Sequence, residues 1–270
     1  MYSNEKRGES KIKNKGQVTI FIIIAILIVG LAVLIYFVIP KAETTAVFDE
    51  KNPYAFIQAC LEDKIKDTVE IISLQGGSIA PEHYFTYNNT NIEYLCYTSE
   101  YYITCSIQRP FLIEHIESEI ENEIKEDVIS CFNALEESYK EKNYNVEMEQ
   151  LGRTTVELLP KRVVTSFNYV LTVSKAQTDR YDSFSVILNN NLYELVSISN
   201  DMIDWEATHG DFDTLYYMTL FSNIKIEKYK QLDGTTIYIL INRDTGNKFQ
   251  FASRSVAWPP GYGEVPVFYE

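Results

Sequence analysis

Residues 18–39 read VTIFIIIAILIVGLAVLIYFVI, and no charged residue occurs between Gln17 and Pro40. As a helix rising about 1.5 Å per residue, this run covers roughly 33 Å, enough to cross a hydrocarbon core about 30 Å thick. We therefore expect a single transmembrane helix over residues 17–40, with Val18 to Ile39 in contact with the lipid bilayer. The run separates a short leader from a much longer remainder, residues 41–270.

The leader, residues 1–16, carries an excess of positive charge. Its charged residues are Glu5, Lys6, Arg7, Glu9, Lys11, Lys13 and Lys15. Lysine and arginine beside a span hold that side in the cytoplasm, so we expect a single-pass protein of the cell membrane with an extracytoplasmic C-terminal domain. The whole chain has a net charge of −14, and the part beyond the leader is more acidic still. Such a surface repels nucleic acid, which is therefore not an expected partner.

A cleaved secretory signal fits this segment poorly. The apolar region of such a signal is about 7–15 residues long and ends at a small-residue cleavage site. Here the run is longer, and it ends in Val38-Ile39-Pro40-Lys41 without a small-x-small pattern. The apolar segment is thus expected to remain part of the protein.

Residues 13–21 read KNKGQVTIF and resemble the class III signal peptide of archaeal type IV pilins and related proteins. The resemblance covers about the first 40 residues. It implies cleavage by a prepilin peptidase between Gly16 and Gln17, after which the apolar helix can pack into a filament of like or unlike subunits. The family usually carries a glutamate five residues into the mature chain, where this sequence has Phe21. The alternative is an uncleaved signal anchor with a basic flank.

Residues 41–142 are expected to form a helical region that contains the cysteines. Asn52-Pro53 is a typical helix start, with Asn52 as the N-cap, and Gly76-Gly77 is a typical helix end. A second helix is expected to begin at Pro110. Apolar residues in both segments recur at steps of three and four, which indicates one buried face on each helix. The acidic residues between Glu114 and Asp127 are expected to form a solvated face.

Residues 143–270 are expected to form a β-rich region with one helix. Strand patterns occupy 154–159, 163–173, 183–188, 224–229, 235–241 and 248–256. Residues 191–207 fit a helix, with Trp205 on its inward face. The predicted fold class is therefore α+β, a transmembrane helix followed by an extracytoplasmic helix pair and antiparallel sheet. The sequence leaves open whether the two regions outside the membrane fold separately.

The four cysteines all lie in the region 41–142. An even number of cysteines outside the membrane favours disulfides, and four allow three pairings. We favour Cys60 with Cys131, which would join the two helices, and Cys96 with Cys105, which would close a hairpin. The spacing does not match a structural zinc site, where ligands come in pairs two to four residues apart.

The densest polar cluster lies in the sequence DWEATHGDFD. It comprises Asp204, Glu206, His209, Asp211 and Asp213, a set of oxygen and nitrogen donors that could bind Ca²⁺. The spacing does not match an EF-hand, and the alternative is a helix end that runs into an acidic loop. Asn88 begins one N-glycosylation sequon.

No catalytic motif accompanies these residues, so neither an enzyme activity nor a cofactor is expected. The 20 tyrosines supply large amphipathic contact areas, which suit adhesion or subunit packing. The sequence therefore favours a membrane-anchored surface protein with a structural or adhesive role, such as a minor pilin-like subunit. The alternatives are an anchored extracytoplasmic enzyme that uses the 204–213 cluster and an anchored ligand-binding receptor.

Overall fold

The computed structural model describes residues 22–30, which are helical, and residues 48–257. Contacts divide the chain into two units, Met1–Thr45 and Ala46–Glu270. In the described part of the chain, no helix meets the length and hydropathy required of a membrane span. The leader, the Gly16-Gln17 processing site and most of the predicted 17–40 span lie outside the described residues.

Helix α2 (Pro53–Leu74) begins and ends at the predicted signals. The Asn52 side chain accepts a hydrogen bond from the Ala55 amide at 3.2 Å, and Pro53 occupies the first turn, where its missing N–H costs nothing. After the last turn, Gly76 and Gly77 adopt positive φ angles of 83° and 108°. The predicted apolar stripe is buried: Ile57, Leu61, Ile65, Val69 and Ile72.

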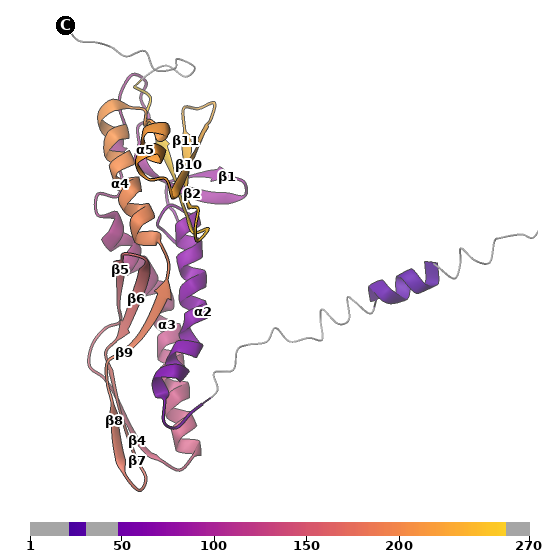
Figure 1. The fold of residues 1–270 in the computed structure, drawn as a ribbon, viewed down its shortest axis with the longest axis vertical. Coiled ribbons are helices and arrows are strands. Elements are labelled where there is room, and N and C mark those ends of the chain that lie inside the picture. The colour runs from indigo at the N-terminus through magenta and orange to yellow at the C-terminus, as the bar shows by residue number, and fades with distance from the viewer. Residues whose placement is uncertain (1–21, 31–47, 258–270) are drawn as a thin grey trace, which may run out of the picture. The chain divides into compact units, whose positions relative to one another are not determined.

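Helix α3 (Leu112–Glu141) runs antiparallel beside α2 (Figure 1). Its buried residues recur every three or four positions, from Leu112 through Ile116, Ile120, Ile124 and Val128 to Leu135. Cys60 of α2 is joined to Cys131 of α3, the pairing favoured from the sequence. Closing a loop of 71 residues restricts the unfolded chain, which by the chain-entropy account contributes about 4 kcal/mol to stability.

The largest sheet joins the two regions that the sequence distinguished. Its strand order is β1-β2-β12-β11-β10. β1 pairs with residues 90–93 of β2, and β3 pairs with Cys96 and Tyr97 of the same strand. The strands are β1 (Tyr84–Tyr87), β2 (Thr90–Tyr97), β3 (Ser106–Ile107), β10 (Ile224–Lys230), β11 (Thr236–Asn242) and β12 (Lys248–Arg254). β2 and β12 are parallel, and all other pairs in the sheet are antiparallel. The regions 41–142 and 143–270 therefore share one sheet within a single compact unit.

The second disulfide closes the loop between β2 and β3. Cys96 lies in β2 and Cys105 directly precedes β3, with their Cα atoms 5.3 Å apart. This is again the pairing favoured from the sequence. Together the two bridges leave no free cysteine in the described part of the chain.

Two three-stranded antiparallel sheets, β4-β7-β8 and β5-β6-β9, occupy the chain between α3 and α4. Their strands are β4 (Asn145–Gln150), β5 (Thr155–Leu159), β6 (Arg162–Phe167), β7 (Tyr169–Ser174), β8 (Thr178–Tyr181) and β9 (Phe184–Asn189). The single strand expected over 163–173 is wrong. It is interrupted at Asn168, and the two resulting strands, β6 and β7, belong to different sheets. Buried residues keep the same alternation across the break, from Val163 to Val173, so the pattern does not reveal it.

The acidic face of α3 is not simply solvated. β5 pairs only with β6, so its other edge presents N–H groups that need acceptors. Glu117 Oε1 accepts from the Leu158 amide at 2.8 Å, and Glu121 Oε1 accepts from the Val156 amide at 3.0 Å. Four residues of a helix and two residues of a strand both advance about 6 Å along their axes. Glu117 and Glu121, four residues apart on α3, can therefore reach amides two residues apart on β5.

Helix α4 (Leu192–His209) confirms the predicted helix but corrects one inward position. Leu192, Leu195 and Met202 are buried, whereas Trp205 is 45 % exposed and Glu206 is buried in its place. The indole N–H of Trp205 instead donates to the Asp211 carbonyl at 2.9 Å. A short helix, α5 (Thr214–Leu220), follows, although the sequence pattern did not indicate one.

The three sheets occupy different positions along the helix pair (Figure 1). Strands β4, β7 and β8 lie at the end where α2 begins and α3 ends. The β1-β2-β12-β11-β10 sheet lies at the opposite end, together with α4 and α5. This arrangement brings the last turns of α2 close to the turns that precede α4 and β12.

Candidate functional site

The 204–213 cluster does not assemble into a cation site. Glu206 points into the core, where Oε1 accepts from the Tyr238 hydroxyl and from the Phe212 amide at 3.0 Å. Asp211 instead pairs with Lys228 at 2.6 Å and with Lys230 at 3.0 Å.

The remaining members of the cluster also have other roles. Asp213 caps α5 by accepting from the Leu215 amide at 2.9 Å, and the His209 ring stacks on Trp205. Asp204 contributes its main-chain carbonyl to the Thr208 hydroxyl. Within residues 22–30 and 48–257, no group of three or more potential ligands is placed to hold a metal ion.

A serine and a histidine do meet elsewhere, at the junction of α2, β2 and α3. The Ser78 hydroxyl lies 2.8 Å from Nε2 of His115 and donates its proton to Glu93. Both Nε and Nη2 of Arg109 donate to the other oxygen of Glu93, at 2.9 and 2.6 Å. Since the only hydroxyl proton goes to Glu93, the His115 ring donates to Ser78 rather than accepting from it.

This network differs from a nucleophile–base pair. A general base must accept the proton of the nucleophile, and here the carboxylate takes that place. Ser78 is also only 3 % exposed, so a substrate cannot reach its hydroxyl. Burial, followed by the charge of Arg109, lowers the pKa of His115 below its usual value of 6.5. The network is therefore best understood as a set of structural hydrogen bonds that joins the end of α2 to β2 and α3.

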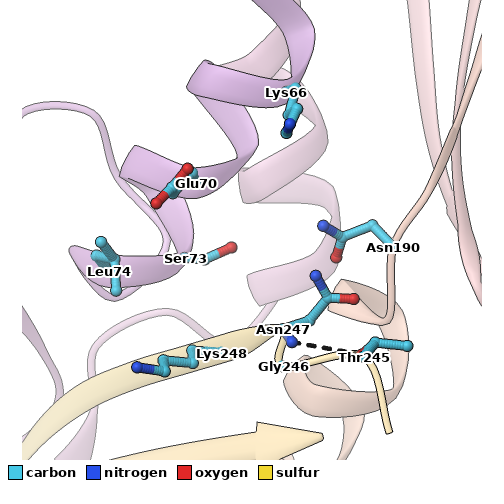
Figure 2. Close-up of a pocket in the computed structure, with 9 residues that line it drawn as sticks. All are labelled: Lys66, Glu70, Ser73, Leu74, Asn190, Thr245, Gly246, Asn247 and Lys248. Atoms are coloured by element: carbon cyan, nitrogen blue, oxygen red, sulfur yellow. Dashed lines mark hydrogen bonds between the residues drawn. The ribbon is translucent and has the colours of Figure 1, made fainter. Parts of the chain in front are cut away.

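A cleft opens where the second half of α2 faces two turns, the β9–α4 turn and the β11–β12 turn. Its volume is about 390 Å³. Figure 2 shows Ser73 of α2 and the side chains of Asn190 and Asn247 turned toward the same space, whereas Lys248 extends away from them.

A second opening of about 630 Å³ adjoins the first and shares Asn190, Thr245 and Asn247 with it. Six of its lining residues are asparagines: Asn189, Asn190, Asn191, Asn223, Asn242 and Asn247. We refer to the two openings together as the asparagine cleft. Their volumes fall in the range of small-ligand sites in proteins.

Four of these asparagines, Asn190, Asn191, Asn242 and Asn247, use their side-chain oxygens in hydrogen bonds within or between the two turns. Asn190 Oδ1 accepts from the Leu192 amide at 2.9 Å, which begins α4. Asn242 Oδ1 accepts from the Asp244 and Thr245 amides at 3.0 and 3.1 Å, which closes the β11–β12 turn. Such local bonds are the reason asparagine is favoured in turns and caps.

Two further bonds join the turns to each other. Asn191 Oδ1 accepts from the Thr245 hydroxyl at 2.9 Å, and Asn247 Oδ1 accepts from the Asn191 amide at 3.2 Å. Because each oxygen is held in this way, the orientation of each side-chain amide group is fixed.

The amide nitrogens of these four asparagines have no acceptor in the described part of the chain, although each can donate two hydrogen bonds. Asn191 and Asn242 are only 7 % and 4 % exposed, and both line the cleft. Their nitrogens are not sealed from solvent, because the fully enclosed atoms without a partner are Thr165 Oγ1 and Glu194 Oε2. The cleft therefore presents donors that are held in place and available.

Glu194 also lines the cleft. Its Oε1 accepts from the Lys161 amide at 2.9 Å, whereas Oε2 is enclosed and has no partner among the described residues. A buried acceptor without a partner is costly, so a movement of the Glu194 side chain that brings Oε2 to a donor would gain free energy.

The charges around the cleft balance. Three lysines and three acids line it: Lys66, Lys161, Lys248, Glu70, Glu194 and Asp244. No aromatic side chain is among the described residues that line either opening. The lining therefore offers hydrogen-bonding groups without an excess of either charge.

The sequence pattern does not reveal this cleft. The run Asn189-Asn190-Asn191 before a helix was a visible signal, but its partners lie about 50 residues away in another turn. Asn88, the first residue of the glycosylation sequon, occupies the exposed β1–β2 turn, where Asn88 and Asn89 have positive φ angles. No known protein family, curated protein or solved structure was found to match this chain.

Proposed function

We propose that this chain is a membrane-anchored surface protein with a structural or adhesive role, and that residues 48–257 lie outside the cell. The observation that carries the proposal is the complete pairing of the described cysteines in two disulfides. Disulfides persist in oxidising compartments and are rare in the cytosol. The apolar run 18–39 and the basic leader supply the anchor and its orientation.

Within this class, a minor pilin-like subunit is the more specific proposal. The basic leader and the sequence Gly16-Gln17 before an apolar helix support it. Processing by a prepilin peptidase would release a chain that begins at Gln17, and Val18 to Ile39 would then contact lipid or neighbouring subunits in a filament. Phe21, in place of the usual glutamate, favours a minor subunit or a pilin-like membrane protein over a main filament subunit.

The test is the intact mass and N-terminal sequence of the protein from native membranes, with thiols alkylated before reduction. We expect a chain that starts at Gln17 and four cysteines protected from alkylation. Gly16→Val should block processing, whereas Gly8→Val in the same leader should not. A chain that starts at Met1 or Tyr2 would overturn the pilin-like proposal. Four alkylated cysteines would overturn the extracytoplasmic location.

A ligand-binding receptor is the second candidate function, and the asparagine cleft favours it. An enzyme that uses the 204–213 cluster has less support, because Glu206 and Asp211 already hold internal partners. The cleft provides fixed donors at the surface of the unit, and an enclosed acceptor of Glu194 lies beside them. Recognition of a ligand there is compatible with an adhesive role.

A further inference from the structure

We propose that the asparagine cleft binds a neutral carbohydrate, a short oligosaccharide that the protein meets at the cell surface. The inference rests on the proposed surface role only for where the sugar is encountered. Its chemistry comes from the cleft itself, from the unused amide nitrogens of four asparagines and the unpartnered oxygen of Glu194.

The cleft requires a ligand with acceptors that point in several directions. Asn190 and Asn247 direct their amide nitrogens toward the space beside α2 (Figure 2). Asn191 and Asn242 line the adjoining opening and are more than nine-tenths buried. Their oxygens are held by backbone amides and by Thr245, so none of the four side chains can turn to offer an acceptor without breaking a turn.

The same ligand must also donate a hydrogen bond. Glu194 lines the asparagine cleft, and its Oε2 is enclosed without a partner among the described residues, so a ligand meets this oxygen only when the Glu194 side chain turns toward the cleft. A carboxylate offers only acceptors, so its partner must carry an O–H or N–H group. A sugar hydroxyl is both donor and acceptor, and a ring bearing several hydroxyls can satisfy Glu194 and the asparagine amides together.

The surroundings disfavour other ligand classes. A phosphate or a polyanion would face Glu70, Glu194 and Asp244, whose charges offset those of the three lysines. A nucleobase or an apolar ligand would find no aromatic side chain among the described lining residues on which to stack. A neutral molecule rich in hydroxyl groups has neither disadvantage.

The fixed amides also reduce the entropic cost of binding. A flexible polar side chain loses conformational freedom when a ligand immobilises it, and that loss weakens binding. Here that freedom is already lost on folding, because the oxygen of each asparagine is bonded within or between turns. The cleft is therefore organised before the sugar arrives.

Asparagine-to-aspartate substitutions test the inference with little change in shape. Asn190→Asp keeps the oxygen that accepts from the Leu192 amide, and Asn247→Asp keeps the oxygen that accepts from the Asn191 amide. Each removes one amide donor and leaves its internal bond in place. Asn145→Asp, on exposed β4, adds the same charge outside the cleft and serves as the matched control.

The experiment measures binding of the purified full-length protein in detergent to immobilised maltotriose, chitotriose, mannotriose and trigalacturonic acid. We expect at least one neutral trisaccharide to bind. Asn190→Asp and Asn247→Asp should each weaken it about tenfold or more, while Asn145→Asp leaves it unchanged. Glu194→Gln, which keeps an oxygen for Lys161 but replaces the free acceptor with a donor, should weaken binding to a similar extent.

Three results would overturn the inference. They are no binding by any neutral trisaccharide, binding that the cleft variants do not change, and preference for the acidic trisaccharide. Thermal unfolding of each variant shows whether it is folded, and Glu194→Gln provides a second route if an aspartate variant unfolds. Start site and thiol pairing are measured separately, so failure here leaves the proposed anchoring and location untouched.

Discussion

Glu93 and Glu206 are both only 2 % exposed, yet the structure stabilises them in different ways. Glu93, in β2, receives two hydrogen bonds from the guanidinium of Arg109 and one from Ser78. Glu206, in α4, receives bonds from neutral groups, namely the hydroxyls of Tyr238 and Ser253 and the Phe212 amide. Lys228, which lies near Tyr238, is bonded to Asp211 instead.

The difference shows two ways to bury a carboxyl group. The guanidinium of Arg109 compensates the negative charge of Glu93, so the stability of this ion pair depends on both partners. Without a bonded cation, burial raises the pKa of Glu206 from 4.5 to about 7, although the Tyr238 hydroxyl partly opposes that rise. The first site should therefore be sensitive to removal of its partner and the second to pH.

Replacement of Arg109 should have the largest effect. Arg109→Met leaves the Glu93 carboxylate buried without its cation, and we expect the free energy of unfolding at pH 7 to fall by about 4 kcal/mol. Urea denaturation measures the change. Addition of Glu93→Gln should recover part of the loss, because no unpaired charge remains. A loss below about 1 kcal/mol would mean that water reaches Glu93 through the site vacated by Arg109.

The effect of pH on Glu206 should be the second largest. Its pKa is higher in the folded state, so the folded protein binds the proton more tightly, and the contribution to stability is complete below pH 4.5. That contribution should be lost as the pH rises through about 7, at a cost of about 3 kcal/mol. Glu206→Gln should remove this part of the pH dependence in urea denaturation, whereas exposed Glu147→Gln should not. Identical profiles for the wild type and Glu206→Gln would contradict the assignment.

Removal of one neutral donor should have the smallest effect. Tyr238→Phe takes a hydrogen bond from Glu206, and we expect about 1 kcal/mol lower stability at pH 5. Because that bond lowers the pKa of Glu206, its loss should also move the pH-dependent transition upward. Tyr229→Phe is the matched control, since Tyr229 bonds Glu227 at the exposed surface. A downward movement of the transition would show that the Tyr238 hydroxyl does not stabilise the carboxylate.

Much of the local structure could be predicted from the sequence. The Asn52-Pro53 start of α2, its buried stripe and the Gly76-Gly77 end are local signals, and each occurs as expected. Strands β10, β11 and β12 follow from alternating apolar residues and from turns at Gly234 and Gly246. Caps, turns and burial periods are encoded by residues close together in the chain, and packing here does not override them.

The predictions that failed needed information about distant residues. The break at Asn168 interrupts no apolar pattern, because both flanking strands bury alternate residues in the same phase. Trp205 lies one position away from buried Glu206, and only the surrounding sheet decides which of the two faces inward. The carboxylates of Glu117 and Glu121 find their partners on β5, about 40 residues later in the chain.

Composition and local periodicity were enough to establish the apolar run, the basic leader, the two long helices and the favoured cysteine pairing. That pairing also follows from the even cysteine count and from the place of Cys60 and Cys131 beside two apolar stripes. In contrast, the contact of Glu93 with Arg109, the burial of Glu206 without a bonded cation and the gathering of the asparagines in one cleft depend on how distant segments pack together. The physical reason is that a polar group is satisfied by whichever partner the fold brings within about 3 Å, and sequence spacing does not specify that distance.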